Sequence, residues 1–147
     1  MTGSRLFGIF TGIAVLAAAL GGCGGRTVDW PTYGGDGENH WSPLDQIDDG
    51  NVGKLGLEWH YDIATPGSNF TAPIAVGGVV YFAGGQAIVH ALDARTGKLL
   101  WQYDPKVMER AGAEIRGAWG SRGMAYANGR VFVGTMDGRL IALDARS

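Results

Sequence analysis

Short β-strands are the first elements that the hydrophobic pattern predicts. In residues 78–82 and 129–133, apolar side chains recur at every second position, and both runs begin with glycine. A period of two is the side-chain period of a β-strand, and glycine-rich turns bound both runs. The pattern therefore predicts a strand in each of the two stretches.

The two predicted strands belong to an internal repeat. Each is followed by the same five residues, ALDAR, which begin at Ala91 in one copy and at Ala142 in the other. Gly78 and Gly129 are 51 residues apart, and so are the two alanines, so the copies align without a gap. A period near 50 made of short strands is typical of the four-stranded blades of a β-propeller. The chain is therefore predicted to be all-β, with about two blades.

Turn residues place further elements in the first copy. Residues 93–97 (DARTG) predict a turn, because the Asp and Thr side chains can cap nearby backbone groups and the Gly tolerates a positive φ. A strand over 98–103 is expected to leave this turn. Apolar residues near helical spacing in 105–116 predict a short helix or an ordered loop between the blades.

The second copy contains a hairpin signal. Asp137-Gly138 lies between predicted strands over 131–135 and 139–143. The chain stops at 146–147, where the first copy continues into its last strand. We therefore expect residues 24–147 to be the N-terminal part of a propeller that is truncated within a blade.

An orphan strand is predicted ahead of the first blade. Residues 57–62 (LEWHYD) resemble the blade-ending residues 100–104 (LWQYD), yet no earlier strands of a blade precede them. Such a strand makes sense if it completes the last blade of a closed ring, since closure removes the exposed edges of an open sheet.

The first 23 residues predict an export signal. Arg5 precedes an apolar run over 6–20, which is short for a membrane span. Residues 20–23 (LGGC) resemble the bacterial lipobox, in which the cysteine is lipidated and becomes the first mature residue. Lipidation of Cys23 would hold a periplasmic body at a membrane. The alternative is ordinary cleavage near 17–19, which would leave the cysteine as a free thiol.

Charge and cysteine content exclude several classes. The formal net charge is −2, and the twelve Lys and Arg residues are spread singly along the chain, so nucleic acid is not an expected partner. Cys23 is the single cysteine, so no intrachain disulfide can form. No phosphate loop or nucleophile elbow is present.

Most remaining polar and aromatic candidates are predicted to be structural. Asp93 and Asp144 occupy equivalent turn positions, which favours capping over acid–base work. Trp59 and Trp101 are interpreted as packing between blades. His90 lies in a predicted strand and is expected to be half-buried. Two more sets lack metal-ligand spacing: the three histidines, far apart in sequence, and residues 48–51 (DDGN).

Three segments carry a resemblance to a known family. They are 30–47 (WPTYGGDGENHWSPLDQI), 91–101 (ALDARTGKLLW) and 121–144, which begins SRG and includes VFVGTMDGRLIALD. The first is similar to the N-terminal signature of the quinoprotein alcohol and glucose dehydrogenases, which depend on the cofactor PQQ. The second resembles that family's tryptophan-docking blade repeat, and the third its segment beside the cofactor. The resemblance implies an eight-bladed propeller in the full-length parent.

The resemblance singles out Arg122 as a cofactor-binding residue. In the family, the Arg of this Arg-Gly step lies over the quinone ring, where a guanidinium can stabilise developing negative charge. Many alcohol-oxidising members carry two adjacent cysteines just before it, but residues 116–120 (RGAWG) have none. Trp119 is a possible stacking residue there, or a buried structural Trp. Phe70 stands where methanol oxidisers have a Glu, so that subtype is not indicated.

The function implied by the resemblance is oxidation of an alcohol or sugar hydroxyl. Two electrons would pass to PQQ, and then to an acceptor such as a cytochrome c or a quinone. A calcium ion would polarise the cofactor, with its ligands and the general base expected beyond Ser147, so these residues alone are expected to be inactive. The alternative is a non-catalytic propeller lipoprotein that acts as an outer-membrane assembly scaffold.

Overall fold

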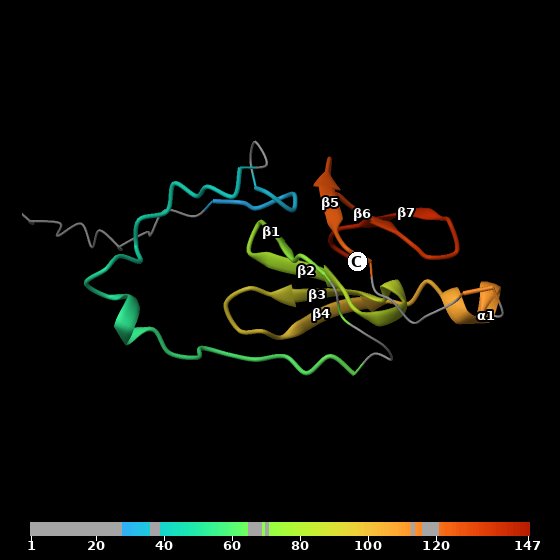
Figure 1. Cartoon of the computed structure of the whole chain (residues 1–147), viewed down its shortest axis with the longest axis horizontal. Helices are drawn as coiled ribbons and strands as arrows, with labels where there is room; N and C mark the ends of the chain where they lie inside the picture. The colour runs from blue at the N-terminus through green and yellow to red at the C-terminus, as the bar shows by residue number, and fades with distance from the viewer. Residues whose placement is uncertain (1–27, 36–38, 65–68, 70, 113, 116–120) are drawn as a thin grey trace, which may run out of the picture.

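Two antiparallel sheets follow one another along the chain (Figure 1). The structure is a computed structural model, and it describes residues 28–35, 39–64, 69, 71–112, 114–115 and 121–147. The four strands of the first sheet lie in sequence order: β1 Ile74–Val76, β2 Val79–Ala83, β3 Val89–Asp93 and β4 Leu99–Tyr103. The second sheet has three strands, also in sequence order: β5 Met124–Ala127, β6 Arg130–Gly134 and β7 Leu140–Asp144.

Helices are short and lie outside the sheets. α1 (Val107–Ala111) lies between the two sheets in the chain, which confirms the short helix predicted within 105–116. Two 3-10 helices, η2 (Val52–Lys54) and η3 (Gly85–Ala87), make single turns in loops. None of the helices in the described ranges is long and apolar enough to cross a membrane.

The turns form as their residue types predict. The Asp93 carboxylate accepts hydrogen bonds from the backbone amides of Arg95 and Thr96, at 3.1 and 2.8 Å, and Gly97 has a φ of +68°. In the second copy, the Asp144 carboxylate accepts in the same way from the Arg146 amide, at 2.9 Å. Both carboxylates therefore cap turns, and hydrogen bonding to their charged forms lowers the pKa of each.

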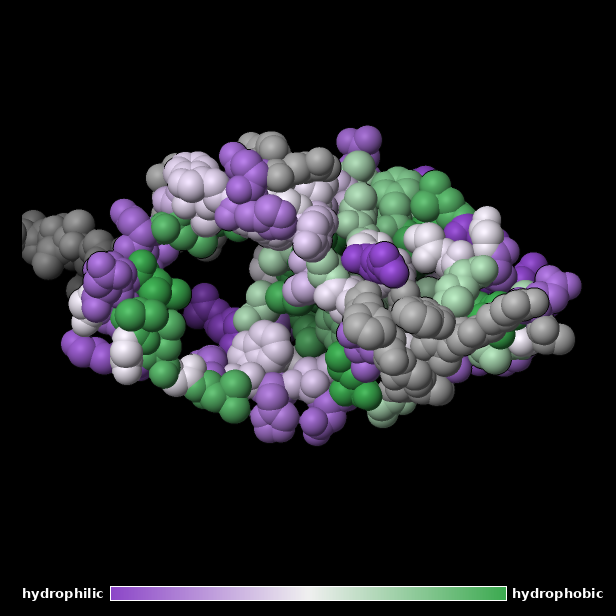
Figure 2. All heavy atoms as spheres, viewed as in Figure 1, coloured by the Kyte–Doolittle hydropathy of each residue, from purple (hydrophilic) through white to green (hydrophobic). Residues whose placement is uncertain are grey.

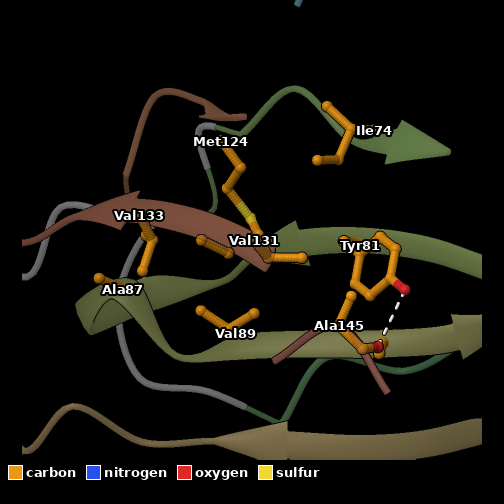
Figure 3. Packing of buried hydrophobic residues seen from close by; sticks show 10 residues of the cluster. Ile74, Tyr81, Ala87, Val89, Met124, Val131, Val133 and Ala145 are labelled. Atoms are coloured by element: carbon orange, nitrogen blue, oxygen red, sulfur yellow. Dashed lines mark hydrogen bonds between the residues drawn. The ribbon is translucent and has the colours of Figure 1, made fainter. Parts of the chain in front are cut away.

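One face of the first sheet packs against the second sheet (Figure 3). Because side chains alternate along a strand, Tyr81 and Ala83 of β2 point to this interface, while Phe82 lies on the opposite face. The buried residues of this core are Ile74, Tyr81, Ala83, Ala87, Val89, Ala91, Met124, Val131, Val133 and Ala145. The Tyr81 hydroxyl, at 3.0 Å, donates to the carbonyl of Ala145 across the interface.

A tryptophan side chain donates a hydrogen bond to a turn of each sheet. The Trp59 indole N–H donates to the Ala94 carbonyl at 3.1 Å, and its ring lies so close to Gly97 that a Cβ there would come within 2.4 Å. The Trp101 indole N–H donates to the Ala145 carbonyl, also at 3.1 Å. Ala94 and Ala145 are equivalent positions of the repeat, so both contacts join one repeating unit to the next. The predicted packing role of the two tryptophans is confirmed.

Residues 57–62, the predicted orphan strand, are not paired with any described strand. They have no ladder hydrogen bonds, although Trp59 and Tyr61 both contact the first sheet. The physical reason is that no strand in the described ranges lies beside them, and a strand exists only through its pairing. Side-chain contacts with the first sheet hold this segment instead.

The first described residues bind the free edges of both sheets. Trp30 exchanges two backbone hydrogen bonds with Ala75 of β1, at 2.6 and 2.9 Å, and the Pro31 carbonyl accepts from Tyr126 of β5 at 3.0 Å. The Asp29 carboxylate accepts from the amide of Gly77 at 2.9 Å. The signature segment that begins at residue 30 therefore joins two blades at their first strands.

Residues 41–57, which include the end of this segment, expose apolar side chains. Figure 2 shows apolar groups on the surface of the N-terminal part of the chain. The large exposed residues between 41 and 57 are Trp41, Leu44, Ile47, Val52, Leu55 and Leu57. Scattered apolar side chains are normal on a protein surface, but a run of this kind marks a surface that other parts of a protein can cover.

Candidate functional site

One end of the two sheets gathers the loops that carry the predicted site. The registers place the start of β5 beside the end of β6, and the end of β4 beside the start of β3. The turn 84–88, the turn 135–139 and the long connection from β4 to β5 therefore share this end. We call the described residues between the end of β4 and the start of β5 (104–112, 114–115 and 121–123) the connector (Figure 1).

Arg122 lies in the last residues of the connector, two positions before β5. Its side chain is exposed, and within the described residues it has neither a hydrogen-bond nor an ion-pair partner. The turn beside it is closed by the Ser121 hydroxyl, which donates to the carbonyl of Gly123 at 2.8 Å. A permanently charged guanidinium without a protein partner can bind an anionic or carbonyl-bearing ligand.

Several predicted residues lie outside the described part of the chain. Trp119 and the rest of 116–120 are among them, as are Phe70 and Cys23. The possible stacking role of Trp119 and the lipidation of Cys23 stay predictions. The sequence-predicted site is therefore represented in the structure by Arg122 alone.

A partly buried ion pair lies on the turn 135–139, at the same end of the sheets. The Arg139 Nε donates to the Asp137 carboxylate at 2.7 Å, and the Asp137 side chain is only 5% exposed. The Thr135 hydroxyl donates to the other oxygen of this carboxylate. Hydrogen bonds from Arg139 first, and from Thr135 next, lower the pKa of Asp137, so it stays charged.

The ion pair also contacts the connector. Arg139 Nη2 donates to the carbonyl of Pro105 at 2.7 Å, 34 residues earlier in the chain. A cavity of about 480 Å³ lies between Asp137 and a later part of the connector, at Glu114 and Ile115. The sequence analysis did not find this cluster, although one signal was available: the two repeats differ in residue type at these aligned positions.

His90 is more buried than the sequence predicted. It was expected to be half-buried, but it is 1% exposed, because Tyr61 and Phe82 cover the face of the sheet on which it lies. The Phe82 ring stacks on the imidazole at 4.8 Å, and the Tyr61 hydroxyl is 3.3 Å from Nδ1. Burial lowers the pKa of His90, so the ring is neutral at pH 7.

No metal cluster is formed by the described residues. No three His, Cys, Asp or Glu side chains among them come together in a geometry that could hold an ion. The carboxylate of Asp48 instead accepts from the Gly50 amide at 2.8 Å, as in an ordinary Asx turn.

The fold and the repeat define a class of protein. Consecutive antiparallel sheets packed face to face, with tryptophans that donate to repeat-equivalent carbonyls, are blades of a β-propeller. A family model described as the β-propeller domain of glucose, ethanol and alcohol dehydrogenases, named PQQ, matches residues 30–147. The chain belongs to this PQQ β-propeller family.

Curated relatives agree with the family. The dehydrogenase subunit of a quinone-dependent alcohol dehydrogenase from Gluconobacter oxydans (strain 621H) is 49% identical over 138 residues. That match covers 93% of this chain and 18% of the relative. A 1-butanol dehydrogenase (cytochrome c) from Thauera butanivorans is 44% identical over 120 residues, which cover 81% of this chain and 17% of the relative. The chain thus spans about a fifth of the length of these relatives.

Solved structures agree as well. The quinohemoprotein alcohol dehydrogenase ADHIIG of Pseudomonas putida HK5 aligns with a TM-score of 0.72 and 45% identity, over 81% of this chain and 18% of that one. A europium-containing methanol dehydrogenase aligns with a TM-score of 0.67 and 32% identity, over 80% of this chain and 21% of that one. The all-β propeller fold predicted from the repeat is confirmed.

Proposed function

We propose that this chain is part of a PQQ-dependent dehydrogenase that oxidises an alcohol or a sugar hydroxyl. Family membership supports the reaction class, and the related proteins named above are alcohol dehydrogenases. The observation that carries the proposal at the level of residues is the exposed, unpartnered guanidinium of Arg122. It lies at the end of the sheets where the connector and both turns meet.

The guanidinium of Arg122 fits the chemistry of PQQ. PQQ is an anionic quinone that supplies two-electron redox chemistry when bound, and it needs donors near its carbonyl oxygens. Arg122 has its full set of guanidinium donors available among the described residues. Its charge does not depend on pH in the physiological range, so it can hold and orient an oxygen that gains negative charge.

The family also suggests an electron acceptor and a metal ion. The related enzymes are named for a quinone and for cytochrome c, so we propose an acceptor of one of these two kinds. A calcium ion beside the cofactor is part of the proposal for the whole protein. A metal-containing methanol dehydrogenase among the structural neighbours supports a metal in general.

The test of this proposal uses the whole natural protein with PQQ and calcium. Arg122→Lys keeps the charge but loses the planar donor set, and we expect alcohol oxidation with an artificial dye acceptor to fall on the order of a hundredfold. Arg95→Lys, an exposed arginine on a turn at the opposite end of the first sheet, is the matched control and should keep wild-type turnover.

Two results would contradict the proposal. If Arg122→Lys kept wild-type turnover and PQQ affinity, Arg122 would be an ordinary surface residue. If the wild-type protein bound no PQQ, the non-catalytic scaffold would replace the dehydrogenase as the function.

We also propose that the protein is periplasmic and is anchored to a membrane through Cys23. The support is the LGGC sequence at 20–23 after an apolar run. In a bacterial host, the protein should incorporate labelled palmitate and partition into detergent, and Cys23→Ala should abolish both. A mature N-terminus near residue 19, without acylation, would contradict the anchor.

A further inference from the structure

The connector is held by turns of both sheets. At its start, α1 packs against η3 of the first sheet, with Val107 buried. Two residues before α1 begins, the carbonyl of Pro105 accepts the hydrogen bond from Arg139 of the second sheet. The first part of the connector therefore has a fixed place relative to each sheet (Figure 1).

The Arg139 side chain is itself held in one orientation. Its Nε and Nη2 both lie within 2.7 Å of the same oxygen of Asp137, and the Thr135 hydroxyl binds the other oxygen. The Arg139 side chain is 29% exposed, so water competes only partly for these bonds. Charge-assisted hydrogen bonds of this kind restrict a long side chain more than neutral ones do. Nη2 is therefore directed at the Pro105 carbonyl.

The first repeat shows that the turn does not need this ion pair. The turn 84–88 closes with a hydrogen bond from the Gly84 amide to the Ile88 carbonyl at 2.8 Å. The equivalent bond in the second repeat joins the Thr135 amide to the Arg139 carbonyl at 2.9 Å. In the first repeat, Gln86 and Ile88 stand in the places of the ion pair. The backbone thus closes either turn, and what the pair adds in the second repeat is the contact with the connector.

We propose that Arg139, oriented by Asp137, is a positioning residue for the connector and through it for Arg122. The start of the connector is held on the turn between β6 and β7, and its end continues into β5 of the same sheet. Pro105 at one end of the connector and residues 121–123 at the other are therefore attached to the same sheet. The role toward Arg122 rests on the proposed function, whereas the holding of the connector does not.

The first experiment measures the connector without the cofactor, by amide hydrogen exchange of the whole natural protein. Reporter amides are the hydrogen-bonded ones of the connector, at Arg110, Gly112, Glu114 and Ile115. In Arg139→Met they should exchange about tenfold faster or more, because a charge-assisted bond that opposes local opening is lost. Amides of β6 and β7 should keep their rates. Arg130→Met, which removes an exposed arginine on β6, is the control and should change neither set.

The second experiment measures PQQ affinity and the separation of kcat from KM. Loss of positioning in Arg139→Met should lower PQQ affinity or kcat on the order of tenfold to a hundredfold, with KM for the alcohol little changed. Compared with Arg139→Met, Arg139→Lys keeps the charge and hydrogen-bond donors but not the planar guanidinium geometry, so it should recover part of the loss. A merely structural role would shift the melting temperature without this kinetic pattern.

The outcomes separate the two proposals. Unchanged exchange of the connector amides in Arg139→Met would overturn the holding of the connector. Faster exchange with wild-type PQQ affinity and kcat would overturn the role of Arg139 toward Arg122. A wild-type protein that binds no PQQ would overturn the proposed function and that role together, and the exchange rates would still decide whether Arg139 holds the connector.

Discussion

The first sheet buries its two faces in different ways. The face toward the second sheet packs on strands β5 to β7 and is lined by apolar side chains, with the Tyr81 hydroxyl bonded across the interface. The opposite face, with Phe82, His90 and Leu92, is covered by residues 59–63, which form no strand. One face therefore meets the next copy of the repeat, and the other meets a single segment from the N-terminal side.

Both faces border an open cleft, but they differ in their buried polar groups. A cleft of about 250 Å³ lies between the segment 59–63 and Phe82, and one of about 360 Å³ borders Tyr81, Tyr126 and Ala145 on the other face. On the face covered by 59–63, the Nε2 of His90 has no hydrogen-bond partner in the described part of the chain. No such unpartnered atom lies among the described residues of the other interface. A sheet can offer side chains from several strands to fill the spaces of its neighbour, whereas one segment offers a single row. Four predictions test this comparison on the whole natural protein.

The largest expected effect is the loss of stability when an aliphatic side chain is shortened to alanine. It should differ between the two faces of the first sheet. Ile74→Ala should lower the free energy of unfolding by about 2–5 kcal/mol, because Ile74 is only 1% exposed and belongs to the apolar core between the two sheets. Leu92→Ala should cost less, because Leu92 already borders a cavity and the segment opposite can move toward it. Urea denaturation measures both. A larger cost for Leu92→Ala would contradict the comparison.

The second prediction concerns the contact between Gly97 and the Trp59 ring. Gly97→Ala puts a methyl group 2.4 Å from the indole and should displace Trp59, which adds about 1–3 kcal/mol to the cost of a left-handed alanine. Gly129→Ala is the matched control, because Gly129 also has a positive φ, +76°, but nothing lies within 4 Å of its Cβ. Denaturation and tryptophan fluorescence compare them. Equal costs would mean that Trp59 does not dock there in solution.

A smaller effect is expected for Tyr81→Phe on the face toward the second sheet. The variant loses the hydrogen bond to the Ala145 carbonyl, but that carbonyl keeps the bond from the Trp101 indole. The cost should therefore be about 1 kcal/mol, the ordinary net value of one hydrogen bond. Trp101→Phe, which removes the other donor, is expected to cost at least as much. A cost of several kcal/mol for Tyr81→Phe would show that the hydroxyl is essential to the interface.

The smallest effect at neutral pH comes from His90. Its pKa is lowered by burial in the folded protein, so below pH 6.5 the unfolded chain binds a proton that the folded chain does not. Stability should therefore fall as the pH drops below about 6.5, and stop falling below the folded pKa. Within the described residues, Tyr61 is the titratable group in contact with the ring, and burial is the cause of the shift.

The control for this prediction is His90→Leu, which removes the titration and should flatten this part of the stability–pH curve. His60→Leu removes an exposed histidine of the adjacent segment and should leave the curve unchanged. An equal slope in wild type and His90→Leu would show that another group causes the acid sensitivity.

The prediction of elements worked where the signal is local. The turn 93–97, the Asp137-Gly138 hairpin and the short helix α1 form as predicted, because capping and positive φ depend on residues a few positions apart. The predicted pairing of 57–62 with the last blade of a closed ring stays a prediction, because no such blade is among the described residues. These residues resemble a blade-ending strand, but pairing requires a neighbour, which a resemblance cannot supply.

For the candidate site, the resemblance identified Arg122, and the structure placed it on an exposed loop end. The ion pair of Asp137 and Arg139 was missed, although the residues are two positions apart. The pair matters because Arg139 also donates a hydrogen bond to Pro105. A contact between residues 34 positions apart leaves no periodic signal in one sequence. The burial of His90 was underestimated for a similar reason, since Tyr61, which helps to cover it, lies 29 residues earlier in the chain.

The amino-acid sequence by itself determined the repeat, the strand-and-turn alternation and the family, because each depends on residue type and spacing along the chain. Only the tertiary structure decided which face of the first sheet meets which partner, how deeply His90 is buried, and that Arg139 contacts the connector. These are properties of surfaces brought together by folding. Their energies depend on packing and on the exclusion of water between distant segments, which no local pattern encodes.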